Sequence, residues 1–288
     1  AWRFDGVEYH GKLSFLKVAL QLSTAITTVS KNYAHEIQTD DLGMGMTDLL
    51  RYRSEQLSGI LNGIDTRIWD PESDRYLNQN YGARNLEIKA ANKTALQQQL
   101  GLAPRKDIPL LAVISRLAEQ KGLDLLLSLG ATIMNLPAQL VVLGSGDVEL
   151  EQGFLALARQ FPDLCSVNID FDEELAHRID AGADIFIMPS RFEPCGLNQM
   201  YSMRYGTIPV VRATGGLADT VVDAADEKNG NGFVFGESSS EALLEALQRA
   251  TKAWSDPKLW RRLQKHGMAR DSSWDKAARQ YAELYQKL

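Results

Sequence analysis

Residues 183–201 read A-D-I-F-I-M-P-S-R-F-E-P-C-G-L-N-Q-M-Y, and the expected fold can be worked out from this stretch. The apolar run from Ile185 to Met188 predicts a short buried strand, and a helix is expected to begin near Leu197. In an open α/β sheet, ligands bind where loops leave the carboxyl ends of the strands. A helix N-terminus offers unpaired N–H groups and a positive dipole end, so we predict an anion site here with Glu193 at its mouth.

The composition is typical of a soluble globular protein. The 288 residues carry a net charge of −6 and are 44% hydrophobic and 24% charged. This balance allows a large core and argues against a nucleic-acid-binding protein, which needs a basic face. The sequence has no apolar run of the roughly 18 residues that a membrane helix needs. Cys165 and Cys195 form no C-x-x-C pair, which favours a reducing compartment.

From residue 58 onward, predicted strands and helices alternate. We expect strands at 59–62, 108–115, 139–143, 165–169, 184–188, 207–212 and 232–235. We expect helices at 85–100, 120–135, 147–160, 173–181, 197–205, 216–224, 239–254, 257–267 and 273–287. Runs such as 110–114 and 140–143 are apolar throughout, as in parallel strands that are covered on both faces. The pattern predicts an α/β fold with a doubly wound, Rossmann-like parallel sheet.

Residues 1–57 contain fewer predicted elements. We expect a helix over 12–22, a strand over 25–29, a short helix over 31–37 and a loop or linker over 39–57. One strand cannot make a sheet. This strand therefore either joins the larger sheet or belongs to a second domain that is mostly missing, and both alternatives are open at this point.

Charged residues follow two of the predicted strands. Arg116 and Lys121 come after the strand at 108–115, where a loop can bring them together although a helix would not. An arginine fork and a compact lysine charge suit phosphate oxygens. With Glu193 at a neighbouring strand end, the two cations predict a diphosphate site in which Glu193 holds the rest of the ligand. The alternative is a solvated loop in which Glu119 is the partner of these cations.

Glycine motifs open turns at other strand ends. The L-G-S-G motif at 143–146 begins like a dinucleotide fingerprint, but Glu149 holds its third glycine position. We therefore favour a tight turn that a ligand can approach over an NAD site. The four histidines show no ligand spacing, so we expect no metal site. Cys195 has no histidine near it in sequence, so we expect it to make contacts rather than act as a nucleophile.

Together, these motifs resemble bacterial glycogen synthase and plant starch synthase. They are S-R-L-x-x-Q-K-G (115–122), L-G-S-G-D (143–147), P-S-R-F-E-P-C-G-L (189–197), Y-G-T-I-P-V-V-R-x-T-G-G-L-x-D-T-V (205–221) and G-F-V-F (232–235). Upstream, V-S-K-N-Y-A-H-E-I (29–37) and L-N-G-I-D-T-R-I-W-D-P (61–71) are similar to the same family. Many retaining glycosyltransferases carry E-x7-E. Here Tyr201 stands eight positions after Glu193, as in the glycogen and starch synthases.

The resemblance implies a two-domain GT-B glycosyltransferase active in glycogen or starch biosynthesis. Such an enzyme transfers glucose from ADP-glucose to the non-reducing end of an α-1,4-glucan, with retention of configuration. The resemblance implies no metal or other cofactor, and a location in the bacterial cytoplasm or the plastid stroma. Two alternatives are a non-catalytic nucleotide- or glucan-binding module and a related retaining glycosyltransferase with another sugar-nucleotide donor.

The resemblance also assigns roles to residues of this sequence. Arg116 and Lys121 would neutralise the leaving diphosphate, and Glu193, with Cys195 near it, would bind the hydroxyls of the donor glucose. The other implied substrate-binding residues are Asn62 near the reacting sugar, Gly144 in its turn, Phe171 on the base, and Gly196, Leu197 and Asn198, whose amides would hold the distal phosphate. Phe171 stands where the bacterial enzymes usually have Tyr, and Asn198 where the family usually has Thr.

The resemblance further divides the chain. Residues 1–57 would be the end of the acceptor-side domain with a linker, 58–272 the nucleotide-sugar-binding domain, and 273–288 a helix that crosses back toward the N-terminal domain. The chain begins with Ala1 rather than Met, and we expect most of the N-terminal domain to lie upstream. We therefore expect apolar surface to be exposed over 13–29 and 274–288, with self-association as a consequence.

Overall fold

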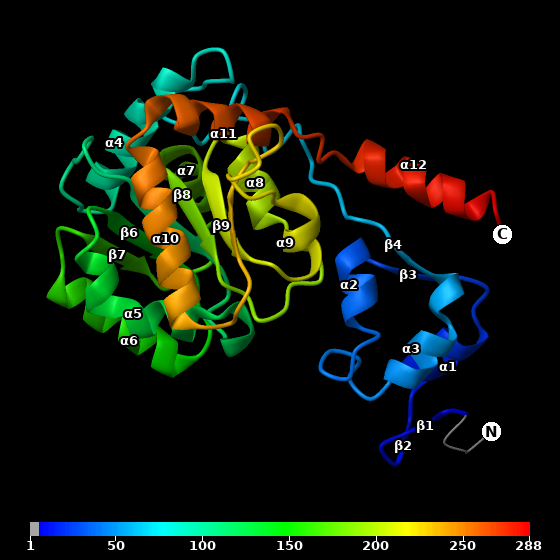
Figure 1. The fold of residues 1–288 in the computed structure, drawn as a ribbon. Helices are drawn as coiled ribbons and strands as arrows, with labels where there is room; N and C mark the ends of the chain where they lie inside the picture. Colours follow the sequence, from blue (N-terminus) through cyan, green and yellow to red (C-terminus); the bar gives the residue numbers. More distant parts are fainter. Residues whose placement is uncertain (1–5) are drawn as a thin grey trace.

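The computed structural model describes residues 6–288, which form a large α/β body with a smaller N-terminal part at one side (Figure 1). The body is built on a six-stranded sheet in which every pair of neighbouring strands is parallel. Its strands, in spatial order, are β10 (Phe233–Phe235), β9 (Ile208–Arg212), β8 (Ile185–Met188), β5 (Leu110–Ile114), β6 (Gln139–Leu143) and β7 (Cys165–Asn168). The predicted doubly wound parallel sheet is confirmed.

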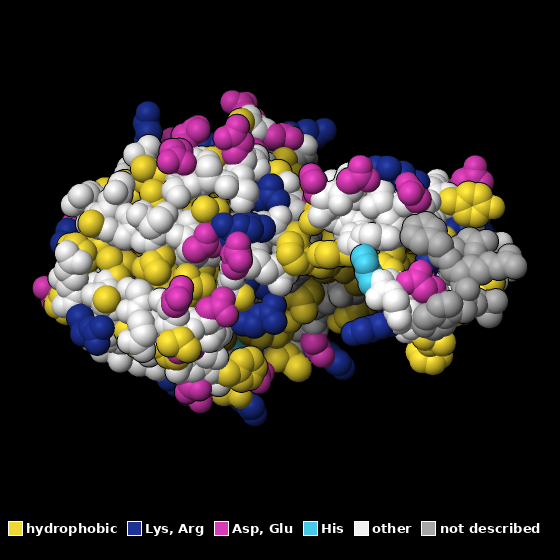
Figure 2. Space-filling view, turned by 90° about the horizontal axis from the view of Figure 1, so that it is seen from below, with side chains coloured by type: hydrophobic (Ala, Val, Ile, Leu, Met, Phe, Trp, Pro, Cys, Tyr) yellow, Lys and Arg dark blue, Asp and Glu magenta, His cyan; other side chains and the backbone are white. Residues whose placement is uncertain are grey.

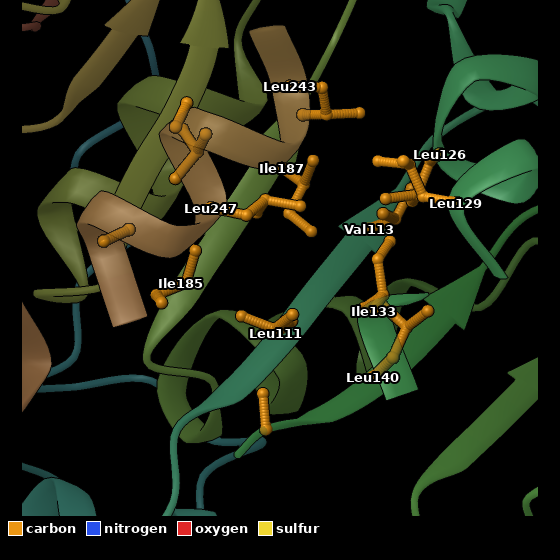
Figure 3. Packing of buried hydrophobic residues seen from close by; sticks show 14 of the residues in the cluster. Leu111, Val113, Leu126, Leu129, Ile133, Leu140, Ile185, Ile187, Leu243 and Leu247 are labelled. Atoms are coloured by element: carbon orange, nitrogen blue, oxygen red, sulfur yellow. The ribbon is translucent and has the colours of Figure 1, made fainter. Parts of the chain in front are cut away.

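Helices cover both faces of this sheet. They are α4 (Lys89–Gln99), α5 (Leu123–Met134), α6 (Val148–Gln160), α7 (Glu173–Gly182), α8 (Asn198–Arg204), α9 (Gly215–Thr220), α10 (Ser240–Trp254) and α11 (Pro257–Ala269). Alternate residues of a strand face opposite sides. Leu111 and Val113 of β5 therefore pack with residues of α5, α6 and α10 (Figure 3), and Leu110 and Ala112 pack with residues of α4 and α7.

The strand order places a topological switch point between β5 and β8. The chain runs from β5 outward to β6 and β7, then returns to the other side of β5 and continues through β8, β9 and β10. The loops that follow β5 and β8 therefore leave the sheet in opposite directions. In such sheets a crevice opens at this point, beyond the carboxyl ends of the strands.

The N-terminal part has its own small sheets. Its elements are β1 (Glu8–Tyr9), β2 (Lys12–Leu13), α1 (Phe15–Leu22), β3 (Ile26–Thr28), α2 (Lys31–Glu36), α3 (Thr47–Tyr52) and β4 (Leu57–Gly59). β3 pairs in parallel with β4, and neither strand joins the six-stranded sheet. The strand predicted at 59–62 was therefore wrong in two respects, because it ends at Gly59 and pairs with β3. Residues 1–5 of the predicted 1–57 segment lie outside the described part of the chain.

Several other predicted bounds differ from the structure, and three of these differences have a clear local cause. The supposed loop at 39–57 contains α3, because Leu50 is buried and the Arg53 guanidinium donates a 2.8 Å hydrogen bond to the carbonyl of Leu20. The helix predicted at 12–22 begins only at Phe15, because residues 12 and 13 pair with β1. The helix predicted at 216–224 ends at Thr220, and the Asn231 side chain then accepts a 2.8 Å hydrogen bond from Val222 N–H.

Apolar side chains reach the surface of the N-terminal part and of α12 (Trp274–Tyr285). Phe15 and Leu22 on α1 are 82% and 78% exposed, and Trp274 and Tyr285 on α12 are 49% and 67% exposed. Figure 2 shows hydrophobic side chains at the surface of the smaller lobe, and charges of both signs interspersed on that face. The predicted exposure is confirmed for these side chains, whereas Ile26 in β3 and Ala277 in α12 are buried. None of the helices described is long and apolar enough to cross a membrane.

Candidate active site

Two adjoining cavities lie at the carboxyl ends of β5, β6 and β8, beside the switch point. The larger has a volume of about 690 Å³ and the smaller about 240 Å³. Both are lined by Ile114 and Ser115 at the end of β5 and by Leu197 and Asn198 at the start of α8. The strand ends at which the sequence predicted a site therefore surround real cavities.

Glu193 lines the smaller cavity and is only 6% exposed. Its Oε2 atom lies 2.6 Å from Nζ of Lys121 and accepts a 3.1 Å hydrogen bond from the hydroxyl of Ser190. Lys121 follows β5, so the cation that pairs with Glu193 comes from the neighbouring strand end, whereas Arg191 in the same segment pairs with Asp124. Burial of a lone charge costs on the order of several kcal/mol, so each group serves as the counter-ion of the other.

Arg116 is exposed and lines the larger cavity. Its Nη2 donates a 3.0 Å hydrogen bond to Oε1 of Gln120, whose Nε2 donates 3.2 Å to the carbonyl of Phe192. The alternative in which Glu119 is the partner of the two cations does not hold, since Arg116 contacts Gln120 and Lys121 contacts Glu193. Gln120 instead ties the loop after β5 to the loop after β8, and Arg116 and Lys121 face cavities that share a wall.

The start of α8 presents unpaired backbone donors to this wall. No acceptor among residues 6–288 receives a hydrogen bond from the backbone N–H of Gly196, Leu197 or Asn198. The Asn198 side chain does have a partner, because its Nδ2 donates a 2.7 Å hydrogen bond to the carbonyl of Ile114. The side chain at this position therefore fastens α8 to the end of β5 and leaves the amides available to a ligand.

Gly144 lines the larger cavity in the turn after β6. Its φ is +155°, and a Cβ atom at this position would lie 1.8 Å from the carbonyl oxygen of Ser115. The close approach that requires glycine is therefore between two loops of the protein. Gly144 allows the turn after β6 to lie against the loop after β5, and it thereby helps to shape the cavity.

Three aromatic side chains line the larger cavity. Phe171, which the sequence singled out, is 90% exposed at the rim. Trp69 and Tyr201 stack with ring centroids 3.8 Å apart, and the other face of Trp69 stacks on His177 at 3.8 Å. Sequence reasoning missed Trp69, although it lies within the L-N-G-I-D-T-R-I-W-D-P motif that carries the resemblance.

A buried polar network holds this stack from behind. His177 Nδ1 lies 2.7 Å from Oδ2 of Asp74, which also accepts a 2.5 Å hydrogen bond from the hydroxyl of Tyr205. His177 and Asp74 are both almost fully removed from solvent. The His177 ring is stacked on Trp69 and hydrogen-bonded to Asp74 at its edge, so it has little freedom to move. The part of the cavity wall that Trp69 forms is therefore rigid.

Asn62 and Cys195 line neither of these two cavities. Asn62 lines a separate cavity of about 270 Å³, together with Asp219 and Arg270. Burial raises the pKa of the Cys195 thiol, and the backbone N–H of Asn62 offsets this only in part. A buried thiol with a raised pKa is a poor nucleophile, in agreement with the contact role expected for Cys195. Within the described residues, no three His, Cys, Asp or Glu side chains are grouped so that they could hold a metal ion.

Sequence comparison gives matches along the chain. A sequence model described as Glycosyl transferases group 1 matches residues 95–269, and one described as Starch synthase catalytic domain matches residues 1–52. The glycogen synthase of Dechloromonas aromatica (strain RCB) is 57% identical and covers 99% of this chain, which covers 60% of that protein. The glycogen synthase of Anaeromyxobacter sp. (strain Fw109-5) is 53% identical, with coverages of 100% and 60%. The chain thus spans about 60% of the length of these curated relatives.

Solved structures give the same result. The catalytic domain of starch synthase IV from Arabidopsis thaliana, bound to ADP and acarbose, has a TM-score of 0.92 and 38% identity. The match covers 99% of this chain and 60% of that one. The Anabaena protein HepE, in complex with UDP and glucose, has a TM-score of 0.66 at 18% identity, which shows a common fold.

Proposed function

This chain belongs to the family Glycosyl transferases group 1 and has the fold of a GT-B glycosyltransferase, and from that premise we propose that it supplies the donor side of a glucan synthase. The proposed reaction transfers glucose from ADP-glucose to the non-reducing end of an α-1,4-glucan, with retention. The observation that carries the proposal is the buried Glu193–Lys121 pair beside the unpaired amides of α8.

In this proposal the leaving diphosphate is held by protein groups. Unpaired N–H groups at a helix start donate hydrogen bonds to phosphate oxygens, and the exposed guanidinium of Arg116 has donors to spare. An ammonium carries three N–H donors, so Lys121 can keep its bond to Glu193 and still donate to a phosphate oxygen. Charge that develops on the departing diphosphate is thereby met by groups already in position.

The remaining assignments follow the two cavities. Glu193 accepts hydrogen bonds from hydroxyls of the donor glucose in the smaller cavity, and Phe171 stacks on the base in the larger one. Because Asn62 lines a different cavity, we propose that it acts from the acceptor side. The division into residues 1–57, 58–272 and 273–288 also belongs to this proposal.

Calorimetry on the 288-residue chain tests the donor assignment. ADP and ADP-glucose are expected to bind more tightly than UDP-glucose, and Arg116→Ala is expected to lower the ADP affinity about tenfold, as the loss of one charge-assisted hydrogen bond does. Tighter binding of UDP-glucose would favour the related glycosyltransferase with another donor. Absence of binding to either nucleotide would contradict the proposal.

Transfer is tested in a full-length version of the protein with a maltooligosaccharide acceptor. Glu193→Ala is expected to reduce the transfer rate by about 10²–10³, the usual loss for one transition-state contact. Near-normal turnover in this variant would refute the role of Glu193. A full-length protein that binds ADP and maltooligosaccharide but transfers no glucose would instead be the non-catalytic binding module.

A further inference from the structure

Helices α2 and α9 are joined by carboxylates, each at the N-terminus of the other helix. Oε1 of Glu36, the last residue of α2, accepts a 2.9 Å hydrogen bond from the N–H of Gly215 and a 3.0 Å bond from the hydroxyl of Thr214. Asp219 on α9 accepts a 3.0 Å hydrogen bond from the N–H of Asn32. The N-terminal part therefore contacts the body through two charged groups that each complete a helix start.

The turn that Glu36 holds also carries the backbone of Glu193. The N–H of Gly216 donates a 3.0 Å hydrogen bond to the carbonyl of Glu193. A Cβ atom at Gly215 would lie 1.9 Å from that carbonyl oxygen, and one at Gly216 would lie 2.0 Å from the carbonyl oxygen of Cys195. The two backbones are therefore packed as closely as glycine permits, and the turn cannot shift unless residues 193–195 shift with it.

Glu36 takes the place of an ordinary helix cap at α9. Thr214 occupies the N-cap position but makes no side-chain cap, because its hydroxyl is turned to Glu36. Oε1 of Glu36 also accepts a 2.8 Å hydrogen bond from Nδ2 of Asn32, and Oε2 is buried without a partner in the described part of the chain. Glu36 is therefore half-buried, with one oxygen held by three donors and the other removed from solvent.

We infer that Glu36 is a positioning residue through which the N-terminal part holds residues 193–195, the Glu193 loop, in place. The connection runs from Glu36 to the Gly215-Gly216 turn, and from there to the backbone of Glu193. Glu36 lines neither of the two cavities at the switch point and acts only through the loop. The effect of Glu36 on binding of the donor sugar rests on the proposed function, whereas the effect of Glu36 on the Glu193 loop does not.

Hydrogen exchange followed by mass spectrometry tests the effect on the loop directly. In Glu36→Ala the amide of Gly216 is expected to exchange about tenfold faster, because one or two hydrogen bonds that hold the turn are lost. Strand β6 is expected to keep its wild-type protection. Glu36→Gln, which retains an acceptor oxygen, is expected to restore slow exchange. Unchanged exchange at Gly216, or an equal increase in β6, would overturn the inference.

Calorimetry supplies the second readout. Glu36→Ala is expected to lower the affinity for ADP-glucose about tenfold while that for ADP stays within about twofold of wild type, because Glu193 is assigned to the sugar. Glu87→Ala is the control, since Glu87 also joins two segments far apart in the sequence, through a 3.2 Å pair with Arg261 on α11, and neither residue lines the two cavities. Equal losses for both ligands would reduce Glu36 to a general structural role and overturn the inference. If the wild-type chain binds neither ligand, the proposed function fails and the exchange experiment alone decides the role of Glu36.

Discussion

Replacement of Lys121 by Met should destabilise the fold by about 3 kcal/mol, because it leaves the Glu193 carboxylate buried without its cation. The two side chains are 22% and 8% exposed, and their charged atoms are 2.6 Å apart. Removing one partner of a buried pair costs about 3–5 kcal/mol. We expect the lower end of that range, because the Ser190 hydroxyl still donates to Glu193 and water reaches the Lys121 side of the pair.

Urea unfolding, followed by tryptophan fluorescence, measures this loss. The double variant Lys121→Met/Glu193→Gln is expected to recover most of the stability, since it removes both charges and leaves a neutral acceptor for Ser190. Lys252→Met, at an exposed lysine on α10, is the control and should change the free energy of unfolding by less than about 0.5 kcal/mol. If Lys121→Met behaves like this control, or if the double variant is no more stable than the single one, the reasoning about the buried pair is refuted.

Three further predictions concern other sites. Burial lowers the pKa of Lys89 to about 7, from the ordinary value of 10.5. Between these two pH values the unfolded chain binds a proton that the folded chain lacks, so the free energy of unfolding rises with pH. Lys89→Met should flatten this slope in urea unfolding at a series of pH values, and an unchanged slope would contradict the assignment. Phe171→Ala should leave stability unchanged and weaken ADP binding about tenfold, as loss of base stacking does. Phe171→Tyr, which keeps an aromatic ring, should keep the wild-type affinity for ADP. Identical calorimetric affinities in the wild type and both variants would exclude stacking on Phe171. Gly144→Ala should lower the free energy of unfolding by more than about 2 kcal/mol, because the added Cβ meets the Ser115 carbonyl. Gly236→Ala, where the added atom meets nothing within 4 Å, should be tolerated. Thermal unfolding should therefore give a clearly lower midpoint for Gly144→Ala than for Gly236→Ala.

Strands that are buried on both faces could be predicted closely from sequence. The run at 139–143 forms β6 with the predicted bounds. All five of its residues are buried, so the strand begins and ends with the run itself. The doubly wound parallel sheet, with a site at the carboxyl ends of its strands, followed from the alternation of strands and helices, whereas the order of the strands was not predicted.

The contacts that build the site could not be predicted in the same way. Lys121 and Glu193 are 72 positions apart, and Glu36 and Gly215 are 179 apart, so no local pattern connects them. An aromatic side chain such as Trp69 gives no local signal of a ligand contact, and its place in the cavity depends on the stack with Tyr201 and His177. Helix α3 was missed because its segment is short and polar and is held in place by tertiary contacts of Leu50.

The pairing of Lys121 with Glu193 has a consequence for how the proposed diphosphate would bind and leave. The Lys121 ammonium is already paired with the Glu193 carboxylate at 2.6 Å, so an incoming diphosphate would share this cation with Glu193. The diphosphate would therefore gain less binding free energy than from an unpaired lysine. When the diphosphate departs, Glu193 is still in place to neutralise Lys121, and the site returns to its starting charge without recruiting an ion from solution. In the proposed reaction, this arrangement would favour release of the anionic product.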